Sequence, residues 1–178
     1  MKNFYQVQVR VYTSEMMEFY KNDPEYGTKA KPYMADSFSE IISPYALFYG
    51  PLKNILLFQN DSTYQFKLDS SDGRPLTFSK DLDSPEMDMV MITDKPSNEK
   101  WKKIFKNAPD MQPNGKVKVK SKKPGNNVFE LETTSDVANG GTIKYSFYFE
   151  FDDDKGVTKY AMIDPEGSAW PPPPPPAP

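Results

Sequence analysis

The stretch that decides the predicted fold is GGTIKYSFYFEFDDDKGVTKYAMI, at residues 140–163. Apolar and polar side chains alternate along its first half, and this period of two is typical of a strand with one buried face. The apolar set is Ile143, Tyr145, Phe147, Phe149 and Phe151. Residues 152–156, DDDKG, then supply turn chemistry before a second apolar run. The stretch therefore predicts an antiparallel β-hairpin.

The same alternation predicts further strands along the chain. They are expected at residues 5–11, 55–58, 63–68, 86–93, 117–119 and 128–131. Because PGNN at residues 124–127 is a turn sequence, the last two of these strands are expected to form a second hairpin. Two short segments, 13–20 and 99–105, have helical patterns instead. The expected fold is all-β: a single antiparallel β-sandwich with one or two short helices and a C-terminal polyproline tail.

The composition removes much of the usual catalytic chemistry. The 178 residues include no Cys and no His, so the chain has no disulfide, thiolate nucleophile, imidazole base or ordinary zinc site. An enzyme would have to use carboxylates, Lys, Tyr or a borrowed cofactor, and no spacing marks a carboxylate pair. We therefore expect a protein that is not an enzyme, with no catalytic residues and no cofactor.

The length suits one domain followed by a tail. Residues 1–169 are expected to form the β-sandwich domain and residues 170–178 the tail, in which Trp170 precedes six prolines. Such a run forms a stiff polyproline II rod of about 3.1 Å per residue. The predicted partner-binding residues are Trp170, Pro171, Pro172, Pro173 and Pro174, and an inert end remains the alternative.

Membrane insertion is not expected, because no apolar run approaches the roughly 18 residues of a spanning helix. The opening MKNFYQVQVRVY alternates apolar and polar residues, unlike the hydrophobic run of a signal peptide. The sequence therefore predicts a mature protein that begins near Met1 and is located in the cytoplasm.

Two acidic groups raise the question of a metal site. Asp152 and Asp154 are candidate ligands, because hard cations such as calcium take several carboxylate oxygens. Their spacing does not match a helix-loop-helix calcium loop, and Asp is common in hairpin turns for conformational reasons. A second group, Asp81, Asp83, Glu86 and Asp88, has the same ambiguity. We expect no metal site, and keep Asp152 and Asp154 as the candidates.

Charge is distributed unevenly along the chain. Residues 95–123 carry ten Lys against two acidic residues, a local charge of +8 that leaves −11 for the rest of a chain whose total is −3. Nucleic-acid binding is not expected, because the whole chain is acidic and the Lys-rich segment has few interleaved aromatics. Opposed charges favour head-to-tail self-association.

Two segments resemble one bacterial family. GGTIKYSFYFEFDDDKGVTKYAMIDPE at residues 140–166 resembles the closing hairpin of the bacterial inclusion-body protein family, the PixA/AidA-like proteins. The matching positions are Tyr145, Phe147, Phe149, Asp152, Gly156, Tyr160, Asp164 and Pro165. VQVRVYTSEMMEFY is similar to the family's first strand and the helix after it, with Tyr33 and Met34 as its next strand. The resemblance implies a β-sandwich without catalytic residues, made in the cytoplasm, in some cases as ordered inclusions.

The sequence thus predicts a non-catalytic structural or assembly protein that self-associates or docks into a larger assembly. Its expected partner is itself or another assembly subunit. The alternative is a carbohydrate-binding, lectin-like module that is assisted by a divalent cation, with exposed Tyr148 as a candidate for stacking on a sugar ring. No ligand-binding residue follows from the sequence beyond that candidate.

Overall fold

The computed structural model describes residues 3–42, 46–49, 52–78, 86–91, 97–106, 108, 110–113, 115–121, 127–137, 142–163 and 166–168. Within them the chain consists mostly of strands, arranged in two sheets with two short α-helices. An all-β fold is therefore confirmed. The predicted tail residues, Trp170 and Pro171 to Pro174, lie outside the described part of the chain.

The first sheet has the strand order β10-β6-β1-β3. Its members are β1 (Asn3–Val11), β3 (Ser39–Ile42), β6 (Ser62–Ser70) and β10 (Val128–Glu132). β1 runs parallel to β6, from Asn3 opposite Ser62 to Val11 opposite Ser70. The predicted alternation holds along β1, where Val7, Val9 and Val11 are fully buried. This face of the sheet forms one wall of the core.

The second sheet is built around β11 (Thr142–Asp152), the longest of the described strands. β11 pairs antiparallel with four strands: β7 (Thr77–Phe78), β8 (Glu86–Met91), β12 (Thr158–Ile163) and β13 (Glu166–Ser168). Around them lie β2 (Tyr33–Met34), β4 (Ala46–Tyr49), β5 (Leu52–Leu57) and β9 (Val117–Lys120). The pairing of β11 with β12 confirms the predicted hairpin.

The expectation of purely antiparallel sheets is wrong. β1 pairs with β6, β2 with β12 and β5 with β13 in parallel. In each case a long segment separates the two strands along the chain, and such a connection allows a parallel crossover that a hairpin turn does not. Both sheets are therefore mixed.

The second predicted hairpin is also wrong. β9 pairs with β8 in the second sheet, whereas β10 pairs with β6 in the first. Both strands alternate apolar and polar residues, and alternation alone does not say which sheet a strand joins. β10 joins the first sheet, where buried Phe129 lies opposite Phe66.

The helices lie close to their predicted positions. α2 (Asn98–Ile104) begins after Ser97, whose hydroxyl oxygen accepts a hydrogen bond from the Lys100 N–H, and it buries Trp101 and Ile104. α1 (Thr13–Phe19) begins after Tyr12, which makes no side-chain capping hydrogen bond. In the described ranges, no helix has the length and apolar character needed to cross a membrane.

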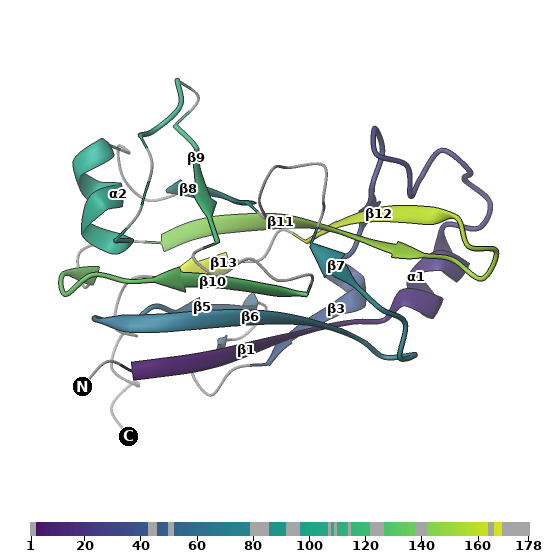
Figure 1. Cartoon of the computed structure of the whole chain (residues 1–178), viewed down its shortest axis with the longest axis horizontal. Coiled ribbons are helices and arrows are strands. Elements are labelled where there is room, and N and C mark those ends of the chain that lie inside the picture. Colours follow the sequence, from purple (N-terminus) through teal and green to yellow (C-terminus); the bar gives the residue numbers. More distant parts are fainter. Residues whose placement is uncertain are drawn as a thin grey trace.

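The two sheets face each other across one aromatic core (Figure 1). Phe66 of β6 lies 5.9 Å, ring centre to ring centre, from Tyr145 of β11, and both residues are fully buried. Phe78 of β7 lies 5.9 Å from Phe129 of β10. These edge-to-face and tilted ring pairs are side-chain contacts that pack one sheet against the other.

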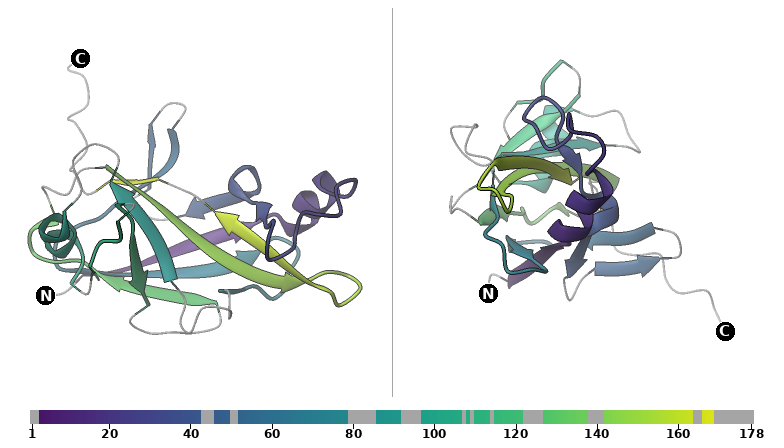
Figure 2. Two further views of the ribbon diagram at one scale, coloured as in Figure 1. Left: turned by 90° about the horizontal axis from the view of Figure 1, so that it is seen from above. Right: turned by 90° about the vertical axis from the view of Figure 1, so that its right-hand side faces the viewer.

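The molecule is elongated along β11, and its two ends differ. Figures 1 and 2 show α2 at one end, and α1 with the β11–β12 turn at the other. We call the second of these the hairpin end. It comprises residues 13–38, the β6–β7 turn (residues 71–76) and the β11–β12 turn (residues 153–157).

Candidate functional site

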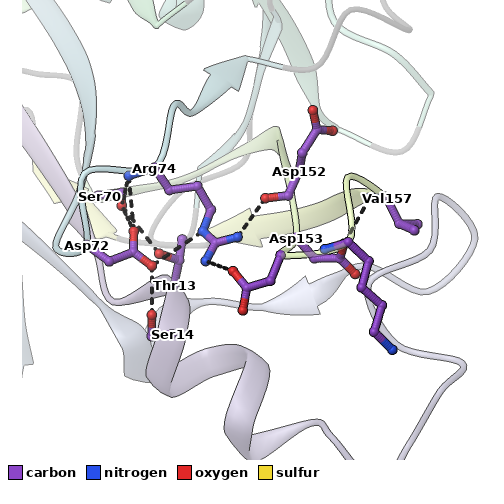
Figure 3. Close-up of polar contacts among 10 residues, drawn as sticks. Thr13, Ser14, Ser70, Asp72, Arg74, Asp152, Asp153 and Val157 are labelled. Carbon is purple, nitrogen blue, oxygen red and sulfur yellow. Dashed lines mark hydrogen bonds and ion pairs between the residues drawn. The ribbon is translucent and has the colours of Figure 1, made fainter.

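The hairpin end brings together three segments that are far apart in the sequence. Asp72 and Gly73 follow β6, and the positive φ of Gly73 (76°) turns the chain back toward β7. Gly156 (φ 74°) does the same between β11 and β12. Thr13 and Ser14 begin α1 beside the first turn. Turn residues therefore place polar side chains of three segments within contact of one another (Figure 3).

Arg74 links these segments, and we call its contacts the Arg74 clasp. Its Nε donates to the Asp72 carboxylate at 3.3 Å, one terminal nitrogen donates to the Asp152 carbonyl at 2.8 Å, and the other to Asp154 Oδ1 at 2.8 Å. The guanidinium lies 5.9 Å from the centre of the Phe151 ring. The Arg74 side chain is only 16% exposed, so these contacts hold the β11–β12 turn against the β6–β7 turn.

Asp72 is the acceptor on which the clasp converges. It accepts hydrogen bonds from the Ser14 hydroxyl at 2.7 Å, from the Arg74 backbone N–H at 3.1 Å and from the Ser70 hydroxyl. Burial by itself raises the pKa of the Asp72 carboxyl, but the hydrogen bonds from Ser70, Ser14 and Thr13 and from the Arg74 N–H outweigh it. The pKa of Asp72 is therefore well below its ordinary value of 3.8.

We expect Asp72→Asn to lower the free energy of unfolding at pH 7 by about 1–2 kcal/mol, since charge-assisted hydrogen bonds are lost. A depressed folded-state pKa gives stability that is present above the ordinary value of 3.8 and is lost as pH falls below it. The difference between wild type and variant should therefore shrink between pH 5 and pH 2, in urea titrations at several pH values. The matched control is Asp154→Asn, because that carboxylate is 85% exposed and should contribute little. An equal loss at every pH would contradict the role of the Asp72 charge.

The candidate metal ligands Asp152 and Asp154 have protein partners in the structure. The Asp152 carboxylate accepts from the Thr158 hydroxyl at 2.9 Å, and Asp154 binds Arg74. Asp153, between them, accepts from the backbone N–H groups of Lys155 and Val157, and these bonds lower the pKa of its carboxyl. In the part of the chain that the structure describes, no three potential ligand side chains form a group that could hold a metal ion. Metal binding at these residues stays untested.

An aromatic cluster adjoins the clasp and runs from the core to the surface. Its members are Phe19, Tyr20, Tyr26, Tyr33 and Phe38. The Tyr33 ring stacks on the Phe151 ring at 6.4 Å, and the Arg74 guanidinium lies over the same Phe151 ring. Tyr20 lies 5.1 Å from Tyr33 and 4.5 Å from Tyr26. The cluster is therefore anchored in the core by Tyr33, whose pKa burial raises.

The outer edge of the cluster is open to solvent. Phe19 is 69% exposed, although its ring contacts Tyr20 at 5.0 Å and Phe38 at 5.4 Å. Among the described residues, six large hydrophobic side chains are exposed, and three of them lie at the hairpin end: Phe19, Met34 and Val157. Single exposed apolar residues are ordinary, but Phe19 packs against the rings of Tyr20 and Phe38, and a contiguous group of this kind is typical of an interaction surface.

Lys31 covers the cluster on one side. Its ammonium lies 4.1 Å from the centre of the Tyr26 ring and 2.9 Å from the Glu25 carboxylate. These contacts hold the loop after α1 over Tyr26, and the Tyr160 N–H fixes the same loop by donating to the Gly27 carbonyl at 3.0 Å. The cluster is thus held in place from both sides.

The opposite end of the molecule is basic. Residues 97–121, which include α2 and β9, carry seven Lys against Glu99 and Asp110. By contrast, residues 13–38, 71–76 and 153–157 at the hairpin end carry eight acidic side chains against five basic ones. Lys102 pairs with Asp110 at 3.0 Å and Lys106 with Asp61 at 3.6 Å, which leaves the basic end with a net positive charge.

The aromatic cluster was not predicted as a site. Its five residues fall within twenty positions of the sequence without a helical or strand period, and the absence of a period predicts only loops. The signal that could have indicated the cluster is the high density of aromatic residues between residues 19 and 38. Tyr148, the predicted stacking residue, is 39% exposed.

Comparison with known proteins adds a distant structural neighbour. No protein-family model matches the chain, and no curated protein is significantly similar to it. A crystal structure of an inclusion body protein, PixA, from Burkholderia cenocepacia is similar over 94% of both chains, with a TM-score of 0.47 and 9% sequence identity. At that distance neither the family nor the function of PixA is transferred to this chain.

Proposed function

We propose that the protein is a non-catalytic assembly protein that self-associates head to tail or docks into a larger assembly. The observation that carries this proposal is the exposed aromatic cluster, held rigidly beside the Arg74 clasp at the acidic hairpin end. A rigid apolar surface loses little conformational freedom on binding, so burial of its rings contributes to association with little loss.

The charges of the two ends support the head-to-tail arrangement. The basic elements α2 and β9 lie toward the end opposite α1 in Figure 1. Contact between unlike ends of two copies brings opposite charges together, whereas contact between like ends repels. Such a heterologous interface extends into rings or filaments.

The polar groups at the hairpin end support a non-catalytic role. The three nitrogens of the Arg74 guanidinium are engaged by Asp72, Asp152 and Asp154. A general base needs an acceptor that is open to a substrate proton, but the Asp72 carboxylate already receives several protein donors. Membership of the PixA/AidA-like family, a cytoplasmic location and carbohydrate binding stay predictions.

Sedimentation velocity of the full chain over a wide concentration range tests this proposal. We expect the mean mass to rise with concentration and to fall with added salt, because the Debye length decreases from about 10 Å at 0.1 M to about 3 Å at 1 M. Lys103→Glu on α2 should weaken association about two- to tenfold.

Lys155→Glu is the matched control, since it makes the same charge change at the acidic hairpin end and should not weaken association. A single monomer mass at every concentration and salt would overturn the proposal. Equal weakening by both variants would overturn the head-to-tail arrangement.

A further inference from the structure

We infer that the aromatic cluster is the acceptor for the proline-rich segment, residues 170–178, of a second copy of this chain. This inference rests on the proposed self-association and names the two surfaces that meet. It follows from the chemistry of the exposed rings, from the composition of the tail and from the length of chain that separates them.

The acceptor has the features that polyproline segments require. Proline-rich segments dock on surfaces lined with aromatic rings, because the flat rings pack against the pyrrolidine rings. Phe19, Tyr20 and Tyr26 form a continuous row, with ring contacts of 5.0 Å and 4.5 Å along it. The two tyrosines are only partly buried, and Lys31 covers the Tyr26 ring on one side. Tyrosine hydroxyls are suitable donors for the carbonyl oxygens of proline, which has no N–H of its own.

The tail matches this acceptor and not a sheet edge. Six consecutive prolines follow Trp170, and a chain without N–H groups at these positions cannot extend a β-sheet. A polyproline II rod is already ordered before binding, so docking loses little conformational entropy. Trp170 adds a large ring that can pack at the edge of the aromatic row.

The first four prolines of the tail, Pro171 to Pro174, cannot reach the cluster of their own chain. Ser168, the last described residue, lies opposite Thr142 at the start of β11, whereas the cluster lies near Phe149, whose β12 partner Ala161 faces Tyr33. Thr142 and Phe149 are seven residues apart on β11, a distance of about 24 Å at 3.4 Å per residue. Pro174 is six residues beyond Ser168 and spans at most about 19 Å as polyproline II. Pro178, ten residues beyond Ser168, could span about 31 Å, so the restriction applies to the first four prolines. Docked on an aromatic cluster, Pro171 to Pro174 must therefore lie on the cluster of another copy.

The geometry agrees with a heterologous contact. Ser168, which precedes the tail in the sequence, lies opposite Thr142 at the end of β11 that is remote from the hairpin end (Figure 1). One copy therefore offers its tail while its own acceptor stays open to the next copy. The charges favour the same head-to-tail order, because the basic end of one copy attracts the acidic hairpin end of the next.

Complementation in the full chain tests this inference. Phe19→Ser removes an acceptor ring that is 69% exposed, and Phe4→Ser is its matched control because Phe4 is 57% exposed but lies on β1, in the first sheet. A tail variant carries Pro171→Gly, Pro172→Gly, Pro173→Gly and Pro174→Gly together. Thermal unfolding of each variant establishes that it is folded. We expect the Phe19 and tail variants each to associate at least about tenfold more weakly than wild type, and Phe4→Ser to associate normally.

The mixture gives the decisive readout. A tail-defective copy still has an intact acceptor, and a Phe19→Ser copy still has an intact tail, so an equimolar mixture should form dimers that neither variant forms alone. If wild type associates but both variants associate equally well, or the mixture gains nothing, the inference is overturned and the proposed self-association stands. If wild type is monomeric throughout, the proposed function itself is overturned.

Discussion

Phe66→Ala is expected to lower the free energy of unfolding by about 3–5 kcal/mol, a large part of the total stability of a domain. Phe66 is fully buried on β6, and its ring meets Tyr145 of the second sheet at 5.9 Å and Phe129 of β10 at 6.5 Å. Truncation leaves a cavity between the sheets that rigid neighbouring rings cannot fill. Urea unfolding followed by tyrosine and tryptophan fluorescence measures the loss.

Phe4→Ala is the matched control for this prediction. Phe4 lies on β1, next to β6 in the same sheet, but its side chain is 57% exposed. Its truncation should change the stability by less than about 0.5 kcal/mol. A loss below about 1 kcal/mol for Phe66→Ala would show that the sheets do not depend on this contact.

Gly27→Ala is expected to cost about 2–5 kcal/mol, because two penalties act together. Gly27 has a φ of 79°, where an L side chain is strained, and an added Cβ would lie 2.5 Å from Cζ of Tyr33. The Tyr33 ring cannot withdraw easily, since it lies between Tyr20 and Phe151. We expect the variant to disturb the aromatic cluster as well, and therefore to weaken self-association. Thermal unfolding together with sedimentation velocity measures both effects.

Gly156→Ala separates the two penalties. Gly156 has nearly the same φ, 74°, but an added Cβ would meet nothing within 4 Å. The variant should lose only the cost of backbone strain, about 1–2 kcal/mol. Equal losses in the two variants would show that the contact with Tyr33 is not a source of destabilisation.

Local patterns in the sequence predicted local structure well. The alternating rings of β11 and the glycine at 156 specify a hairpin because both the strand and its turn are encoded within about 25 adjacent residues. The spacing of Trp101, Ile104 and Phe105 likewise places α2 with its apolar face toward the core. Each of these features depends on periodicity and turn chemistry alone.

The pairing of strands that are distant in the chain could not be predicted from the sequence. β1 has the pattern of a half-buried strand whether its neighbour is parallel or antiparallel, so the parallel register with β6 could not be read from it. β9 and β10 show the same ambiguity between sheets. The candidate site had the same limitation, because Asp72, Arg74 and Asp154 become neighbours only when the β6–β7 turn, which connects the two sheets, meets the β11–β12 turn of the second sheet. The basic charge of the Lys-rich segment, by contrast, could be predicted from the amino-acid composition of residues 95–123 alone.

The central position of β11 has a consequence for synthesis of the chain on the ribosome. β11 bridges β7 and β8 on the one hand and β12 and β13 on the other, yet it begins only at Thr142. Until that residue has emerged, the earlier strands of the second sheet have unpaired backbone groups and an uncovered apolar face. A nascent or prematurely terminated chain of about 140 residues is therefore a species prone to aggregate.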